Sequence, residues 1–384
     1  MSSGWQATLP AILRLLVDRR WWSHNGDVQF SAMAAAQLTL LFIASLVAIF
    51  PPGAASVERL YADWLYPIIQ ANLTSLSNRV PIALFDIAAV AWLLILIGIW
   101  TKSIKQARKQ QRLRALWRGL AATLTLLAVV YLWFIAVWGL NYSRPRLESQ
   151  LTFDASKVTP QAVRALAEHA VAQANRTYAA AHAAGFPGTW DAPQSLIDGL
   201  HGVEKELGRP RPTVVARPKV TLFSPYYRAA GVSGQLAPLF LETLLNPDIT
   251  GPERPAVLGH EWAHLAGYAP ESDASFVGLL AAMRAGPAGE YSAWLDLVSE
   301  AARELQPVTQ RLVLEQLGPG PRQDQNAIRE RLKTRVPTID RAAWATYDQM
   351  LRSQGVEEGV QSYSRVIELL IGTDVLKLPP IINP

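Results

Sequence analysis

The fold is decided by the stretch Thr250-Gly-Pro-Glu-Arg-Pro-Ala-Val-Leu-Gly-His260-Glu261-Trp-Ala-His264-Leu-Ala-Gly267. This stretch predicts one helix with its own start and stop signals. Thr250 and Glu253 have the spacing of a capping box, and Pro252 suits the first turn. Gly267 is typical of the position that follows the end of a helix. The side chains in the middle of this helix carry the chemistry.

His260 and His264 are four residues apart, so both imidazoles project from one face of the helix and can bind one metal ion. Glu261 lies one residue further round, where its carboxylate can reach a water molecule on the metal. Zinc lowers the pKa of such a water to about 7, and the glutamate takes the proton. The pattern predicts a Zn2+ hydrolase with Glu261 as general base. An amphipathic helix with two exposed or hydrogen-bonded histidines is the alternative.

Zinc needs a third protein ligand, and two acids follow the predicted helix, Glu271 and Asp273. Glu271 lies in the first turn of a second predicted helix. Small residues on the same face would let the two helices approach closely: Ala274, Ser275 and Gly278. Asp273 is shorter and should point about 200° away round the helix, so we expect Glu271 to be the ligand. A first-turn acid that favours the helix dipole explains either residue without a metal.

Composition divides the chain of 384 residues into a basic, apolar N-terminal part and a nearly neutral remainder. Only 17% of the residues are charged, against about a quarter in soluble domains, so a wholly soluble enzyme is not expected. Three apolar stretches approach the roughly 20 residues that cross a bilayer: 30–50, 81–100 and 119–140. We therefore assign residues 1–140 to a membrane region with three transmembrane helices. The absence of cysteine excludes Cys-ligated zinc and thiolate nucleophiles.

Positive charge is concentrated between the second and third stretches, where seven Lys and Arg residues lie between Lys102 and Arg118 without an acid. Because both flanks are long apolar runs, 101–118 is typical of a basic cytoplasmic loop rather than of a nucleic-acid site. The N-terminus is then cytoplasmic and the C-terminal part faces outward. We expect the lipid bilayer as a partner and no nucleic acid. Asp86, near the outer end of its span, is expected to be a solvated or snorkelling carboxylate.

Residues 141–384 are numerous enough for an independent extracytoplasmic domain. Helical spacing covers about 159–184 and 193–207 and returns after the metal motif. Short strands are predicted between these helical regions, at 213–215, 220–223 and 239–245. The fold class is therefore α+β with helix dominant, following an all-α membrane region. The apolar stretch 239–245 could be an edge strand that pairs with an extended peptide, and an ordinary core strand explains it equally well.

Several segments together resemble known families. His260-Glu261-x-x-His264 followed by Glu271-x-x-Ala274 resembles the gluzincin metallopeptidases, in which such a glutamate is the third ligand. Most of the chain is similar to domain-of-unknown-function family 3810, which comprises bacterial membrane proteins similar to zincins. Three further segments carry that similarity: Trp138-Gly-Leu-Asn141-Tyr142, Ser224-Pro225-Tyr226 and Gly359-Val-Gln-Ser362-Tyr363. The resemblance implies a zincin-like metallopeptidase domain outside the bacterial inner membrane, on the periplasmic side.

A peptidase also needs a donor for the oxyanion that develops on the substrate. No histidine follows His264, so a downstream histidine is excluded from this role. The resemblance points to Tyr363 as a catalytic residue, in an element that could fold over the site, with Tyr226 as second candidate. A buried tyrosine that packs the C-terminal helix explains either residue equally well. The sequence departs from the family at Asp273-Ala274-Ser275, where Glu-Ala-Asn is usual.

These observations predict a membrane-anchored zinc metallopeptidase that hydrolyses protein or cell-envelope peptide substrates. The alternative is a non-proteolytic, metal-binding membrane scaffold or sensor. Glu261 argues against that alternative, because a structural zinc site does not need a base beside it. An intramembrane protease is disfavoured, because Glu253 and Arg254 open the motif helix and it lies outside any 20-residue apolar run.

Overall fold

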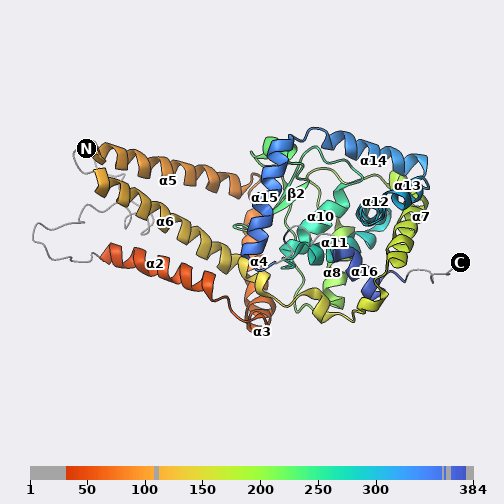
Figure 1. The fold of residues 1–384 in the computed structure, drawn as a ribbon, viewed down its shortest axis with the longest axis horizontal. Helices are drawn as coiled ribbons and strands as arrows, with labels where there is room; N and C mark the ends of the chain where they lie inside the picture. Colours follow the sequence, from red (N-terminus) through yellow and green to blue (C-terminus); the bar gives the residue numbers. More distant parts are fainter. Residues whose placement is uncertain (1–31, 108–111, 357–358, 360–364, 378–384) are drawn as a thin grey trace, which may run out of the picture. The chain divides into compact units, whose positions relative to one another are not determined.

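The computed structural model describes residues 32–107, 112–356, 359 and 365–377 (Figure 1). The chain forms two compact units. The first unit comprises Met1–Pro52 and Ala88–Ala136, and the second comprises Gly53–Ile87 and Val137–Pro384. Helices dominate both units, as the composition predicts.

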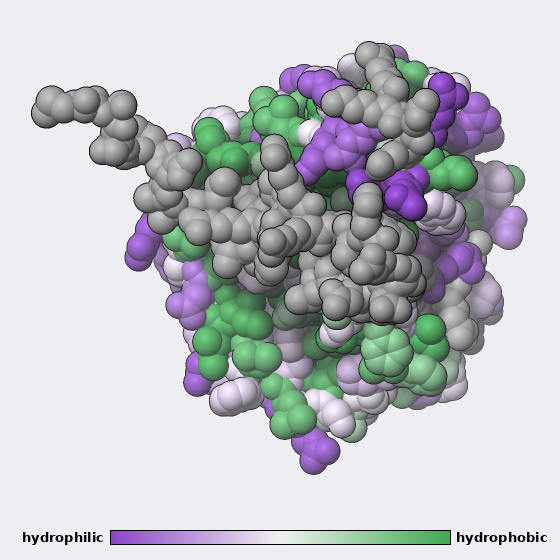
Figure 2. Space-filling model, turned by 90° about the vertical axis from the view of Figure 1, so that its left-hand side faces the viewer, coloured by the Kyte–Doolittle hydropathy of each residue, from purple (hydrophilic) through white to green (hydrophobic). Residues whose placement is uncertain are grey.

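The first unit is built from helix α2 (Ala32–Ile49) and from most of α5 (Leu84–Ala107) and α6 (Arg112–Val137). Two helices, α5 and α6, are each long and apolar enough to cross a membrane. A third crossing requires residues 34–49 to be combined with 54–78, across a break that bends the chain by 109°. Many large apolar side chains of these helices are exposed. Figure 2 shows patches of hydrophobic residues among hydrophilic ones on the face that it presents.

The basic stretch predicted as a loop at 101–118 is mostly helical. Helix α5 continues to Ala107 and α6 already begins at Arg112. The physical reason is that this stretch is rich in Lys, Arg, Gln and Ala, which are all good helix formers. Five of the seven positive charges therefore stand on the ends of two helices, and the other two belong to residues 108–111, which lie outside the described residues.

The second unit begins with α3 (Ala54–Ser56), the π-helix η1 (Val57–Leu65) and α4 (Tyr66–Asn78). After α6 come three short 3-10 helices, η2 (Gly139–Ser143), η3 (Leu147–Gln150) and η4 (Ala155–Lys157). The helices that follow are α7 (Pro160–Ala184), α8 (Gln194–Glu206), α9 (Ser224–Ala230), α10 (Arg254–Leu265), α11 (Glu271–Met283) and α12 (Gly286–Arg303). The last four are α13 (Pro307–Leu314), α14 (Pro319–Leu332), α15 (Pro337–Ser353) and α16 (Arg365–Thr373). Within this unit α10 and α11 lie among the surrounding helices (Figure 1).

The sheet is smaller than the sequence predicts and its edge is a different strand. It contains β1 (Pro218–Lys219), β3 (Glu242–Leu245) and β2 (Gly234–Ala237), in that order. The prediction of strands at 213–215 and 220–223 was wrong, and 239–245 is strand only in its second half. The reason is a hairpin turn at 238–241, where Leu241 adopts a left-handed φ of 52°. Strand β3 pairs with β1 on one side and with β2 on the other, so β3 is central and β2 is an edge strand.

Residues 53–87, which the sequence assigns to the membrane region, contribute helix α4 to the second unit. Polar side chains of α4 are buried and donate hydrogen bonds to backbone carbonyl groups elsewhere in that unit. Gln70 Nε2 donates to Val214 O at 2.7 Å, and Thr74 Oγ1 donates to Leu241 O at 3.2 Å. Because buried polar groups need such partners, the polar character of α4 reflects packing within a domain rather than a solvated loop.

A buried ion pair holds the start of α5 against the sheet. Lys219 Nζ lies 2.6 Å from Glu242 Oε1, and Glu242 is fully buried. The same carboxylate accepts hydrogen bonds from the backbone N–H groups of Leu84 and Phe85 at 3.0 and 2.9 Å. Ser77 Oγ donates to it at 2.9 Å. Glu242 therefore caps the N-terminus of α5, where a negative charge is favoured by the helix dipole.

Replacing Glu242 with alanine is expected to destabilise the second unit by about 3–5 kcal/mol, because Lys219 would remain buried without its counter-charge. The measurement is thermal unfolding of the full chain in detergent, beside the exposed-site control Glu315→Ala. Equal melting temperatures for the two variants would contradict this role of the ion pair.

Asp86 is buried rather than solvated, which corrects the expectation from its position in the sequence. It is 8% exposed, and its Oδ2 accepts from the backbone N–H of Leu222 at 2.8 Å. Thr221 Oγ1 donates to its Oδ1 at 2.5 Å. The segment after β1 therefore covers the carboxylate and replaces the water that the sequence predicts around it.

Candidate metal centre

The two helices of the predicted site cross in unusually close contact. A Cβ atom built on Gly259 of α10 would lie 2.8 Å from Gly278 O, and one built on Gly278 would lie 2.6 Å from His260 N. Only glycine at both positions allows the backbones to approach this far. The close crossing, expected from the small residues of α11, lets the first turn of α11 reach the histidines.

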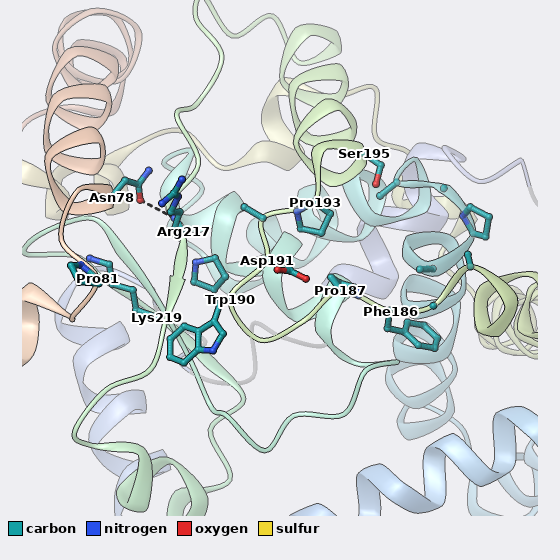
Figure 3. A pocket seen from close by; sticks show the side chains of 18 of the residues that line it. Asn78, Pro81, Phe186, Pro187, Trp190, Asp191, Pro193, Ser195, Arg217 and Lys219 are labelled. Carbon is teal, nitrogen blue, oxygen red and sulfur yellow. Dashed lines mark hydrogen bonds between the residues drawn. The ribbon is translucent and has the colours of Figure 1, made fainter.

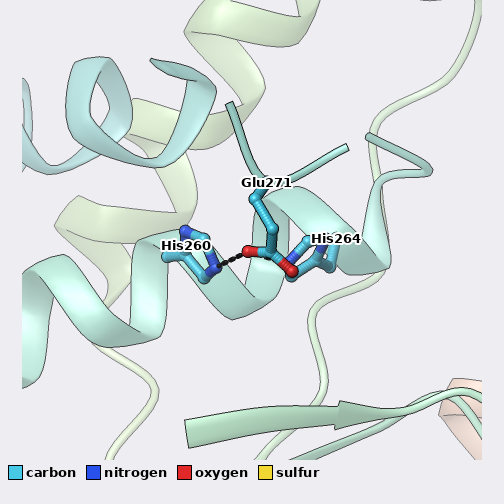
Figure 4. Close-up of side chains that lie close together, drawn as sticks. All are labelled: His260, His264 and Glu271. Atoms are coloured by element: carbon cyan, nitrogen blue, oxygen red, sulfur yellow. Dashed lines mark ion pairs between the residues drawn. The ribbon is translucent and has the colours of Figure 1, made fainter. Parts of the chain in front are cut away.

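Glu271 projects from the start of α11 to a point between the two imidazoles (Figure 4). Its Oε2 lies 3.2 Å from His260 Nε2 and 3.3 Å from His264 Nε2. One ligand atom from each of the three side chains lies within 4.8 Å of the others. The structure thus brings together the three residues that the sequence nominates as ligands.

The ionisation of Glu271 is coupled to that of the two histidines. Burial opposes ionisation of Glu271, but the charges of His264 and His260 hold its pKa well below its usual range. Burial likewise opposes the charged form of His260, but Glu271 raises its pKa to about 9. Glu271 is only 1% exposed, and its Oε2 has the two imidazole nitrogens as its neighbours. Two imidazoles and one buried carboxylate are the donor set that fits a divalent metal such as zinc.

Hydrogen bonds on the far side of the rings orient both imidazoles. His264 Nδ1 lies 2.9 Å from Tyr268 O, and a carbonyl only accepts, so Nδ1 carries the proton and Nε2 is left as a ligand. His260 Nδ1 lies 3.2 Å from Ser275 Oγ. Outer partners of this kind fix the tautomer and the ring orientation in metal sites. The side chain of His260 is 21% exposed, so the cluster is accessible from the His260 side.

The C-terminal end of α10 is fixed by side chains from distant parts of the chain. Trp138 Nε1 donates to His264 O at 3.1 Å, and Tyr66 Oη donates to Leu265 O at 2.7 Å. Arg144 Nη1 donates to Gly267 O at 2.7 Å. These bonds satisfy carbonyl groups that a helix end leaves free. The bond from Trp138 gives the Trp138-to-Tyr142 segment a physical role, because it holds the helix that carries the histidines.

Glu261 lies between the histidines and the edge strand. It is 5% exposed, and a Cβ built on Gly234 of β2 would lie 3.0 Å from its Cγ. Burial raises the pKa of Glu261, while the charges of His260 and His264 lower it. The carboxylate therefore stands beside both the cluster and the backbone of β2, which is where a general base would act on a bound peptide.

The other nominated residues are placed differently. Asp273 accepts from the backbone N–H of Leu147 at 3.0 Å and belongs to no metal cluster among the described residues. Tyr226 is 46% exposed, and its ring lies 6.4 Å from that of Tyr227. Tyr227 is buried instead, and burial and the charge of Glu261 both raise its pKa. Tyr363 lies outside the described residues, so its role stays a prediction.

Tyr347 of α15 is a site residue that the sequence does not reveal. Its hydroxyl donates a hydrogen bond to Glu271 Oε1, the oxygen that faces away from the ion-pair contact. The two residues are 76 positions apart, and no motif links them. Tyr142, whose pKa is raised by burial and by the charge of Glu271, also lies near this carboxylate. A tyrosine on an amphipathic helix gives no signal of such a contact before the tertiary structure is known.

Replacing Tyr347 with phenylalanine is expected to weaken zinc binding by about 10- to 100-fold, the usual effect of removing an outer partner of a metal ligand. Competition with a chromogenic chelator measures this affinity in the full chain. Tyr61→Phe is a matched control, because the Tyr61 hydroxyl is buried without a hydrogen-bond partner among the described residues. Equal affinities for the two variants would exclude Tyr347 from the site.

A cavity of about 1050 Å³ opens elsewhere in the second unit (Figure 3). Trp190, Asp191 and Lys219 help to line it, together with Arg217, whose backbone N–H donates to Asn78 Oδ1 at 2.9 Å. None of the three cluster residues is among the described residues that line it. The chemistry of the site therefore rests on the cluster and not on this cavity.

Comparison with known proteins identifies the family of the chain. No curated protein and no solved structure matches the chain. A family described as a protein of unknown function (DUF3810) matches residues 61–371, which include α4, both long helices α5 and α6, the sheet and the histidine cluster. Since this match covers most of the chain, the protein belongs to the DUF3810 family.

Proposed function

We propose that this protein is a membrane-anchored zinc metallopeptidase that hydrolyses peptide bonds of protein or cell-envelope peptide substrates. The observation that carries the proposal is the convergence of His260, His264 and Glu271 within 4.8 Å. The position of Glu261 beside that cluster adds the group that a hydrolase requires. A zincin-like fold for the second unit is part of the proposal.

Each residue of the site has its own role in the proposed hydrolysis. His260, His264 and Glu271 would hold the zinc, which when bound supplies Lewis-acid activation of water and of the scissile carbonyl. Glu261 accepts the proton of the attacking water and delivers it to the leaving amine. Its buried position raises its pKa, which suits a group that must both accept and release a proton. Tyr363 remains our candidate for stabilising the oxyanion.

The edge strand β2 supports a peptide as the substrate. In the described sheet β2 pairs with β3 on one side, and its backbone runs against Glu261. An extended peptide that adds to the free edge would place a peptide bond beside the glutamate. We assign this role, which the sequence suggested for 239–245, to residues 234–237, because β3 pairs with β1 on one side and with β2 on the other.

The same proposal places the protein in the bacterial inner membrane, with a cytoplasmic N-terminus and a periplasmic second unit. It is supported by the two or three helices that could cross a membrane. The seven basic residues between Lys102 and Arg118 favour the cytoplasmic side for the connection between α5 and α6.

The test is metal content and peptidase activity of the full chain, since α4 is part of the folded second unit. We expect one zinc per chain and cleavage of a peptide library. Removal of zinc by a chelator should abolish cleavage, and added zinc should restore it. Bound zinc without any cleavage would favour the alternative of a metal-binding scaffold, and absence of stoichiometric metal would overturn the proposal.

A further inference from the structure

A short segment of the second unit, which packs beside the first turn of the long apolar helix α5, exposes apolar side chains. Leu222 is 71% exposed, and Phe223 and Tyr226 are 41% and 46% exposed. Single apolar residues on a surface need no explanation, but three within five positions form a patch. We call residues 221–226 the anchor segment.

Hydrogen bonds and ring packing fix the anchor segment beside the first turn of α5. Asp86, the third residue of α5, accepts from Thr221 Oγ1 and from the backbone N–H of Leu222. The ring of Phe223 lies 5.8 Å from the ring of Phe85. Helix α5 is long and apolar enough to cross a membrane, and a span formed by it would begin at this first turn. Leu222 and Phe223 lie beside that turn.

A second apolar patch lies on η1. In η1 the side chains of Leu60 and Trp64 are 69% and 63% exposed. Glu58 of the same helix forms a bidentate ion pair with Arg144 at 2.7 and 2.9 Å, and Arg144 follows the last residue of α6, Val137, by seven positions. Tryptophan is favoured at the boundary between lipid and water. Two separate points of the second unit thus expose apolar groups, one beside the first turn of α5 and one on the helix that is paired with Arg144.

We propose that the anchor segment and the exposed face of η1 lie in the headgroup region of the bilayer, and that the substrate is a polypeptide anchored in the same membrane and cut in its juxtamembrane stalk. The substrate class rests on the proposed peptidase function. The contact of the anchor segment and η1 with the bilayer does not depend on that function and is tested separately.

The path from the anchor segment to the edge strand is short. Helix α9 has seven residues, about 10 Å of helix, and three further residues lead to β2. Tyr227 of α9 donates to Gln235 Oε1 of β2 at 2.9 Å, which joins the two elements. The edge of β2 and Glu261 therefore lie within about 20 Å of the anchor segment, a distance that roughly six residues of extended chain can span. This geometry suits a stalk that leaves the bilayer and adds to β2.

Site-directed labelling tests the surface, because the chain contains no cysteine. The full chain is reconstituted in phospholipid nanodiscs with an environment-sensitive fluorophore on Leu222→Cys or on Val308→Cys. Both positions are 71% exposed, but Val308 lies on α13, away from both patches. We expect blue-shifted emission and quenching by spin-labelled lipid at position 222 only. Water-like emission at both positions would overturn the bilayer contact.

The substrate class is tested with one cleavable sequence presented in two ways. The sequence is placed about six residues from a transmembrane helix in the same nanodisc, or offered as a soluble peptide. We expect the tethered form to be cleaved at least about 100-fold faster at equal total concentration, because tethering raises its effective concentration. Leu222→Asp should lower cleavage of the tethered form by about 10-fold and leave the soluble form unchanged, whereas Val308→Asp should change neither.

The outcomes separate the two parts. Equal cleavage of tethered and soluble forms would overturn the juxtamembrane substrate while the peptidase function stands. Cleavage of neither form by a zinc-loaded protein would overturn the peptidase function and the substrate class together, and the label at position 222 would still decide the surface. Thermal unfolding shows whether the aspartate variants are folded.

Discussion

Glu261→Gln is expected to lower peptidase activity by about 10²- to 10⁴-fold while the protein keeps its zinc. Glutamine has nearly the same shape, so it can occupy the buried space between the cluster and β2. It cannot accept a proton, and the attacking water would lose its base. The side chain contributes no atom to the group of three ligands, so metal content should not change.

The experiment compares turnover and zinc content of the full-length wild type, Glu261→Gln and Glu315→Gln. Glu315 is an exposed glutamate on another part of the second unit and serves as the matched control. Wild-type activity in Glu261→Gln would show that another group is the base. Loss of zinc in that variant would show instead that Glu261 supports the metal.

Glu271→Gln is expected to weaken zinc binding by more than about 100-fold, which exceeds the usual effect of removing an outer partner. The substitution removes the only carboxylate of the cluster and with it the charge that attracts a cation to two neutral imidazoles. Activity should fall in proportion to the zinc lost. High zinc concentrations should restore part of it.

Asp273→Asn is the matched comparison, because Asp273 also lies in the first turn of α11 and is also buried. Its carboxylate accepts from the backbone of Leu147 instead of facing the histidines. We expect this variant to retain its zinc, with a change in thermal stability only. Loss of zinc from Asp273→Asn and not from Glu271→Gln would reverse the assignment of the third ligand.

The sequence predicts that His260, His264 and Glu271 converge, because the rules behind that prediction are local. Spacing by four residues places His260 and His264 on one face of a helix, and small residues on α11 predict the close crossing that brings Glu271 to them. The predicted capping is realised in part, since the Glu253 side chain accepts from the backbone N–H of Thr250. Each of these inferences needs only a few consecutive residues.

Features that depend on contacts between distant residues were predicted poorly. Helix α4 resembles an outer loop in composition, and only its partners on the sheet show why its polar residues are buried. The edge strand β2 begins at Gly234, which looks like turn punctuation until Glu261 is seen to pack against it. Tyr347 reaches Glu271 across 76 positions. Such contacts are set by the packing of whole helices, for which a single sequence carries no pattern.

The most direct test of the account is the position of zinc in crystals of the full chain, located by anomalous scattering at the zinc edge. We predict one site, bonded to His260 Nε2, His264 Nε2 and a carboxylate oxygen of Glu271 at about 2.0–2.2 Å. A zinc site that does not involve these three side chains, or none in active crystals soaked with zinc, would contradict the account.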